Sequence, residues 1–221
     1  MEKIINLKFC DIIYSEGDKS IQKEKELIIR AFNYNKKFFG IKIDKFKVKF
    51  VYSREEFDKI WGSKTENFIS GFIKDELMVL FSYSVFAKET KWKKKYFYEC
   101  LLHEINHLFY EEIRDDSYDP LWLSEGLATF VQSRNKKFKY LKRIKIKKEI
   151  LEEGFEKISV SSYHIYRLFV EYLIKIYGKD NLLKLIKGLK KKEKLDRLFK
   201  EIYKRTFEEL IEDGNRYHKI A

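Results

Sequence analysis

Residues 101–110 read LLHEINHLFY and hold two of the four histidines of the chain, His103 and His107. Positions i and i+4 share one face of an α-helix, so both imidazoles can reach one ion. Glu104 lies about 100° further around the helix, where its carboxylate can reach a water on that ion. The segment therefore predicts a helix with a candidate zinc site. Because this pattern also occurs by chance, two histidines with a purely structural role are an equal alternative.

A catalytic zinc ion needs a third protein ligand, and the later sequence decides its kind. The metzincin pattern requires glycine at position 110 and histidine at 113, where this chain has Tyr110 and Ile113. A carboxylate on a second helix is the alternative, and the segment WLSEGLA supplies Glu125. Glu125 has apolar neighbours such as Trp122, and a carboxylate in such surroundings usually has a partner. Glu125 is therefore the candidate third ligand.

The segment HEINH followed by WLSEGLA resembles the gluzincin metallopeptidases, whose signature is H-E-x-x-H with a later W-L-x-E-G segment. The resemblance implies a thermolysin-like zincin catalytic domain that hydrolyses peptide bonds through a metal-activated water. It implies one Zn²⁺ per chain, bound by His103, His107 and Glu125, with Glu104 as the general base. The likeness runs from about residue 40 to the C-terminus, and it is strong at the motifs and loose elsewhere.

The segment YHIYRLFVEYL, from Tyr163 to Leu173, extends this resemblance. In peptidase-MA-like and aminopeptidase-type members, a tyrosine precedes a helix of the form Y-x-x-x-x-x-φ-φ-x-Y-L, where φ is apolar. The likeness implies that the Tyr163 phenol donates a hydrogen bond to the oxyanion of the tetrahedral intermediate. Tyr166 is the second choice, and a core aromatic is the structural alternative for Tyr163.

Residues 70–81, SGFIKDELMVLF, resemble the glycine-led edge strand of the same domains. Such an edge can hold an extended peptide by backbone hydrogen bonds. The chain departs from the aminopeptidase branch in three ways. Seventeen residues, 108 to 124, separate the second histidine from the glutamate, where eighteen are usual. The G-x-M-E-N segment for a free amine and the large accessory domains are missing. Thr129 and Gln132 also stand where carboxylate partners of the histidines would be expected.

The predicted elements place the chain in the α+β class, with a small mixed sheet in the N-terminal half packed on a mainly helical C-terminal half. Hydrophobic periodicity predicts strands at 3–15 and 44–53, a hairpin over 66–83, and helices at 19–40, 91–113, 120–133 and 161–178. Gly71 is a possible bulge in the hairpin. We expect a single metallopeptidase-like domain over 1–221, with an α/β part at 1–90 and a helical part at 91–221.

Helix boundaries are predicted from capping residues. Ser53 with Glu56, and Thr206 with Glu209, have capping-box spacing. Asp119 with Pro120 is predicted to begin the helix over 120–133, and Asp180 to begin a further helix over 181–189. Glycines at 40 and 178 are predicted to end two helices.

The composition is that of a globular protein, because 44% of the 221 residues are hydrophobic and 17% are aromatic. The two cysteines, Cys10 and Cys100, form no disulfide framework, and a buried free thiol is favoured over a thiolate ligand for Cys100. His164 and His218 are expected to be structural or on the surface. Without a secretory leader or a membrane helix, we expect a cytoplasmic protein.

The net charge of +12 is concentrated in one stretch, because residues 134–148 carry nine basic side chains and no acidic one. A solvated basic face is the favoured interpretation, followed by a rim that attracts acidic peptide or protein substrates. A patch for nucleic acid or anionic lipid is the third. It leads to the alternative function, a basic binding module whose metallopeptidase frame is inactive.

Overall fold

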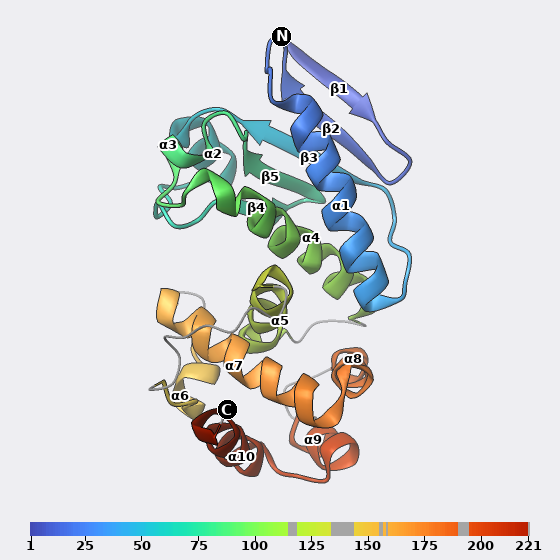
Figure 1. Cartoon of the computed structure of the whole chain (residues 1–221), viewed down its shortest axis with the longest axis vertical. Helices are drawn as coiled ribbons and strands as arrows, with labels where there is room; N and C mark the ends of the chain where they lie inside the picture. Colours follow the sequence, from blue (N-terminus) through green and yellow to red (C-terminus); the bar gives the residue numbers. More distant parts are fainter. Residues whose placement is uncertain (115–118, 134–143, 155–156, 158, 190–194, 221) are drawn as a thin grey trace. The chain divides into compact units, whose positions relative to one another are not determined.

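The computed structural model describes residues 1–114, 119–133, 144–154, 157, 159–189 and 195–220. Its contacts divide the chain into two compact units, Met1–Ile105 and Asn106–Ala221 (Figure 1). The boundary lies inside one helix, α4 (Phe97–Ile113), rather than at residue 90. A five-stranded mixed sheet in the first unit, together with many helices, confirms the α+β class. Whether the two units act as one domain stays a prediction.

The sheet of the first unit has the strand order β1-β2-β3-β5-β4. Its strands are β1 (Glu2–Asn6), β2 (Cys10–Ser15), β3 (Phe46–Val51), β4 (Gly71–Lys74) and β5 (Leu77–Phe81). Strands β2, β3 and β5 are parallel, whereas β1 and β4 run antiparallel to their neighbours at the two edges.

The prediction of a single strand over residues 3–15 is wrong, because this segment folds into the β1–β2 hairpin. Asn6 pairs with Asp11, and the Leu7 N–H donates a hydrogen bond to the Cys10 carbonyl (2.8 Å) across the turn. The predicted β4–β5 hairpin is confirmed. Its turn residues, Asp75 and Glu76, both have positive φ angles (49° and 63°), as a type I′ turn requires.

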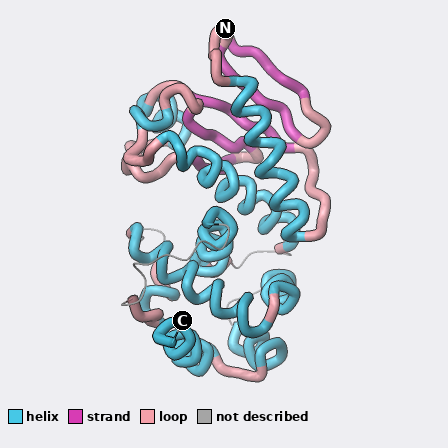
Figure 2. The backbone as a smooth tube through the Cα atoms, in the orientation of Figure 1, coloured by secondary structure: helices cyan, strands magenta, loops and turns pink. Residues whose placement is uncertain are grey.

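The helical elements of the first unit are α1 (Ile21–Phe39), α2 (Arg54–Trp61), α3 (Phe86–Glu89), the 3-10 turn η1 (Lys94–Tyr96) and the first half of α4 (Figure 2). Gly40 ends α1 in the left-handed conformation (φ 73°), as predicted. Ser53 Oγ accepts the Glu56 N–H (3.2 Å), which confirms the N-cap of α2. The Glu56 carboxylate accepts the Tyr52 N–H instead of completing the capping box.

The helix predicted over 91–113 begins later, at Phe97. The Lys91 N–H donates to the Asn67 carbonyl (3.0 Å) and the Trp92 indole N–H to the Phe68 carbonyl (2.7 Å). These two bonds hold the chain against the segment before β4, so it cannot also enter the helix. Within the first unit α4 lies beside α1, because the buried Asn35 amide of α1 donates to the Leu102 carbonyl (3.3 Å).

The second unit contains the rest of α4, α5 (Leu121–Ser133), α6 (Lys148–Leu151), α7 (Val160–Tyr177), α8 (Lys179–Gly188), α9 (Leu195–Tyr203) and α10 (Phe207–Ile220). Its core is aromatic. Trp122 packs on Phe169 with ring centroids 4.9 Å apart, and Phe199 stacks on Phe207 at 5.0 Å. No helix within the described ranges combines the length and the apolar character that a membrane crossing needs.

Two of the four helix boundaries predicted in the second unit are confirmed, and α5 begins at Leu121, one residue after the predicted Pro120. Gly178 ends α7, and Thr206 and Glu209 form the reciprocal capping box of α10. The prediction that Asp180 caps α8 is wrong. Gly178 (φ 88°) is both the C-cap of α7 and the N-cap of α8, so the chain passes directly from one helix into the next. Asp180 consequently lies in the first turn of α8.

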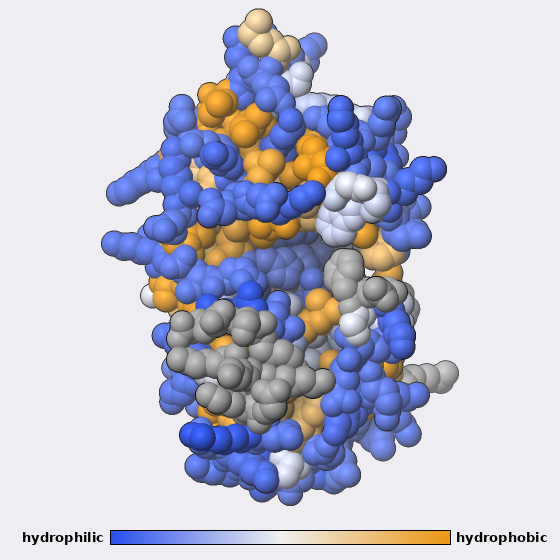
Figure 3. Space-filling model, turned by 180° about the vertical axis from the view of Figure 1, so that it is seen from behind, coloured by the Kyte–Doolittle hydropathy of each residue, from blue (hydrophilic) through white to orange (hydrophobic). Residues whose placement is uncertain are grey.

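Hydrophilic side chains cover most of the face shown in Figure 3, as the lysine-rich composition requires. Large apolar side chains that are exposed in the described part of the chain are few, namely Met1, Ile4, Tyr96 and Ile176. Scattered residues of this kind are normal on a protein surface.

A buried carboxyl group, that of Glu24, lies where β5 ends. Its Oε1 accepts the Tyr83 N–H (2.5 Å) and lies 2.8 Å from the Ser82 hydroxyl. Asp18 Oδ2 also lies 2.8 Å from that hydroxyl, which has a single proton and can donate to one carboxylate only. Burial, together with repulsion from Asp18, raises the pKa of Glu24 to about 7.

We predict that this carboxyl makes stability fall as pH rises. A folded pKa of about 7 against 4.5 favours the folded state at acid pH, and the advantage is lost as pH passes through 7. Glu24→Gln, which does not titrate, should lack this loss. Between pH 5 and pH 8, the free energy of unfolding of the wild type should fall by about 2.5 kcal/mol relative to that of the variant. Urea denaturation at the two pH values measures this difference. A pH-independent difference would contradict the assignment.

Candidate metal centre

The three predicted metal ligands come together in the structure. His103 and His107 lie one turn apart on α4, and their ligand atoms and that of Glu125 are all within 4.8 Å of one another. His107 Nε2 is 3.6 Å from Glu125 Oε1. Two donors on a tetrahedral zinc ion lie about 3.4 Å apart, because each is about 2.1 Å from the metal. The donor set therefore fits zinc, and no other group of this kind occurs among the described residues.

The position of Glu125 is set by the glycine that follows it. A Cβ atom on Gly126 would lie 2.7 Å from the Tyr166 carbonyl oxygen and 2.8 Å from a methyl group of Val170. Only glycine lets the backbones of α5 and α7 meet at this distance. Since Glu125 is the neighbouring residue, this contact fixes the direction in which its side chain leaves α5. The E-G pair of the motif thus has a packing reason.

A partly buried hydrogen bond joins the two helices that carry the candidate ligands in the second unit. The Tyr110 phenol, near the end of α4, donates to the Asp119 carboxylate just before α5 (2.9 Å). Burial raises the pKa of both groups, so the phenol keeps its proton. The sequence predicts Asp119 only as a helix cap and missed this bond. A buried tyrosine nine residues before an aspartate is too weak a local signal to predict it.

Glu104, the predicted general base, is buried, with 8% of its surface exposed. Its side chain lies over the first residue of β4, because a Cβ atom on Gly71 would be 2.8 Å from Glu104 Cγ. Gly71 pairs in regular register with Leu80, so the predicted bulge is wrong. Glycine is required at position 71 because the Glu104 side chain packs on it. The sequence pattern did not predict this contact, since the two residues are far apart in the chain.

The two tyrosines of α7 differ in exposure. Tyr163 is in the first turn of the helix and is half-buried, outside the three-donor group. Tyr166 is fully buried, and its hydroxyl has no hydrogen-bond partner among the described residues. Burial, with smaller contributions from Glu153 and Glu125, raises the pKa of Tyr166 to about 12. The catalytic role of Tyr163 stays a prediction.

Cys100 is not a thiolate. It is a buried free cysteine that receives a hydrogen bond from the Ser70 hydroxyl (3.2 Å), and burial raises its pKa to about 12. His218 Nε2 lies 2.8 Å from the Leu168 carbonyl, which confirms a structural role. His164 is half-buried, and burial lowers its pKa.

Most of the basic stretch, residues 134–143, lies outside the described residues. Its described end is anchored on α10. The Asn215 side chain bonds the N–H and the carbonyl of the buried Ile146 (2.8 and 2.9 Å), and Lys148 pairs with Glu208. At this end of the stretch, the charge of Lys148 is therefore neutralised by an acidic partner. The interpretation of the rest stays a prediction.

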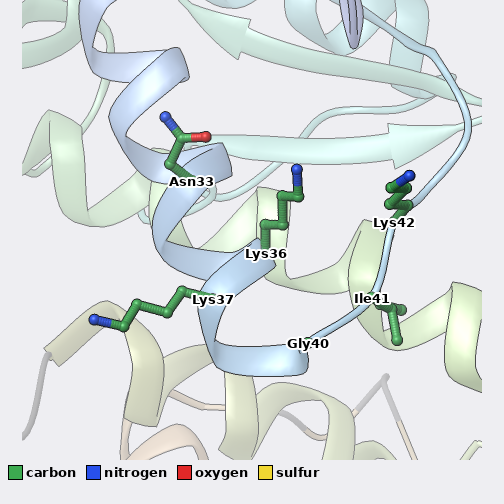
Figure 4. A pocket seen from close by; sticks show the side chains of 6 residues that line it. All are labelled: Asn33, Lys36, Lys37, Gly40, Ile41 and Lys42. Atoms are coloured by element: carbon green, nitrogen blue, oxygen red, sulfur yellow. The ribbon is translucent and has the colours of Figure 1, made fainter.

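A separate hollow lies at the C-terminal end of α1 (Figure 4). Its lining residues are Asn33, Lys36, Lys37, Gly40, Ile41 and Lys42. None of the predicted site residues belongs to it. Lys36 and Lys37 lie in the last turn of α1, where cations complement the helix dipole. The hollow is accordingly not part of the candidate site.

No protein-family model matches the chain, and no curated protein sequence matches it. The resemblance to gluzincins therefore rests on the motifs and on the geometry of their residues.

We predict that the wild type binds one zinc ion and that Glu125→Ala weakens zinc binding by more than about 100-fold, because a ligand is lost rather than an outer partner. Competition with a chelator of known affinity measures this. Glu112→Ala, an exposed glutamate on α4, is the control and should bind zinc as the wild type does. Equal zinc affinity in the two variants would remove Glu125 from the site.

Proposed function

We propose that the chain is a zinc-dependent peptidase of the gluzincin type, with a thermolysin-like zincin fold. The observation that carries the proposal is the convergence of His103, His107 and Glu125, whose ligand atoms lie within 4.8 Å of one another. These are the three residues that the motif resemblance singles out. Two imidazoles and one carboxylate form a ligand set typical of catalytic zinc, with the fourth position left for water. When bound, the ion supplies a water whose pKa falls to about 7.

Glu104 is the residue that moves the proton. A peptide nitrogen leaves readily only when it is protonated, so a group must carry the proton from the nucleophile to the leaving amine. Glu104 follows His103 directly on α4, so its side chain leaves the helix about 100° further around the axis than the His103 imidazole. Its low exposure limits competing hydrogen bonds from bulk water. A single carboxylate can then serve as base and afterwards as acid.

The exposure of the tyrosines favours Tyr163 as the oxyanion donor. A donor to the oxyanion must touch the substrate. Tyr163 keeps part of its surface accessible, whereas Tyr166 has none. We therefore assign the oxyanion role to Tyr163 and a packing role in the core to the buried Tyr166 side chain.

The substrate is proposed to be an extended peptide bound along β4. This strand lies at one edge of the sheet and, within the described residues, pairs only with β5. Its other side can accept a further strand by backbone hydrogen bonds, which recognise peptide regardless of side chain. Acidic peptides are favoured by the net charge of +12.

We predict that Glu104→Gln keeps zinc and lowers kcat by about 10²–10⁴-fold, because the amide cannot take up a proton. Cleavage of a broad peptide library and zinc content measure the two effects. Glu112→Gln, on the same helix, is the matched control and should retain full activity. Peptidase activity retained by Glu104→Gln would refute the mechanism, and a zinc-loaded wild type without cleavage would refute the function.

A second pair of variants tests the tyrosine assignment. Tyr163→Phe should lower kcat by about 10²–10³-fold with little change in KM, since the lost bond forms mainly in the transition state. Tyr166→Phe removes a buried hydroxyl that has no hydrogen-bond partner among the described residues, so it should leave kcat unchanged without loss of stability. The opposite pattern in kcat would move the oxyanion role to Tyr166.

A further inference from the structure

The first residue of β4, Gly71, leaves a space that two side chains fill. A Cβ atom there would lie 2.5 Å from Leu80 Cδ2, 2.8 Å from Glu104 Cγ and 2.9 Å from Glu104 Cδ. Real Cβ atoms essentially never approach other atoms this closely. Gly71 is not among the glycines with positive φ, so its backbone conformation is open to any residue. The side chains above Gly71, rather than its backbone, require the glycine.

The chain before Gly71 is held and cannot move aside. Each of the three carbonyl groups in residues 67–69 accepts a hydrogen bond. The donors are the Lys91 N–H (3.0 Å), the Trp92 indole N–H (2.7 Å) and the Arg54 guanidinium (3.1 Å). The three donors come from the start of α2 and from the segment before η1. Hydrogen bonds from these two segments therefore hold residues 67–69, which lead into β4.

The next residue ties this segment to α4 itself. The Ser70 hydroxyl donates to Cys100 Sγ (3.2 Å), and Cys100 lies one turn before Glu104 on the helix. The same face of α4 is thus bonded to residue 70 and packed on residue 71. These contacts constrain the distance between β4 and the Glu104 side chain.

We propose that Gly71 is a positioning residue, and that the space left by its missing side chain sets where the Glu104 carboxyl group lies. The catalytic meaning of this placement rests on the proposed function. Leu80 is enclosed in the core with 1% of its surface exposed, whereas Glu104 has 8% exposed. An added methyl group at position 71 would lie too close to both side chains, so it displaces Glu104 unless Leu80 alone gives way. A general base must stay within about 3.2 Å of the proton that it abstracts, so such a displacement suppresses proton transfer.

Activity measurements test the catalytic part. Gly71→Ala should keep the zinc content of the wild type, because no ligand is touched, and should lower kcat by about 100-fold with KM changed far less. Gly154→Ala is the matched control, since a Cβ atom there would meet nothing within 4 Å and its φ is ordinary. An unchanged kcat in Gly71→Ala would overturn the positioning role.

A second measurement needs no activity. In a Leu80→Ala background, which removes the other close contact, Gly71→Ala should lower the urea midpoint of the full chain. In the same background with Glu104→Ala, which removes Cγ and Cδ, the loss should largely disappear. An equal loss in both backgrounds would overturn the proposal. If the wild type cleaves no peptide, the proposed function fails, and this comparison alone decides the placement of the carboxyl group.

Discussion

At Gly126 the backbones of α5 and α7 approach so closely that a Cβ atom would lie 2.7 Å from the Tyr166 carbonyl oxygen. The second unit is organised around this contact. One turn before it, Trp122 enters the aromatic core beside Phe169, and directly before it stands Glu125. Because side-chain directions on a helix are fixed by its period, the Glu125 side chain points away from that core. A packing constraint between two helices thus aims a carboxylate at His107.

Gly71 is used in a similar way in the first unit, although the partner differs. At Gly126 the nearest neighbour is a backbone that cannot yield, whereas at Gly71 the neighbours are the side chains of Leu80 and Glu104. The first glycine lets a carboxylate point outward from its helix, and the second lets one settle against a strand. Glycine costs conformational entropy, which is offset here by exact close packing that a larger residue would prevent.

The helices of the candidate centre were predictable because the information is local. The spacing of His103 and His107 defines one face of α4. In the same way, Ser53 and Thr206 mark the starts of α2 and α10, helices outside the centre, through bonds within four positions. The β1–β2 hairpin was not predictable, because residues 7–9 read LKF and contain none of the usual turn formers. The late start of α4 and the role of Gly71 depend on contacts between distant segments, which periodicity does not report.

The surroundings of Glu104 bear on the role of base proposed for it. Among its neighbours are the Gly71 backbone and Cys100, which lies one turn earlier on α4, and both are uncharged. The Cys100 thiol keeps its proton, since burial raises its pKa to about 12 and the charge of Glu104 adds to this effect. A thiolate at that place would repel the carboxylate and compete for metal. The hydrogen bond from Ser70 therefore holds the strand to the helix without introducing a second charge beside Glu104. Glu125, in contrast, lies 3.6 Å from the His107 imidazole, the neighbour with which it would share a metal ion. In the proposed function, Glu104 is accordingly the base and Glu125 the ligand.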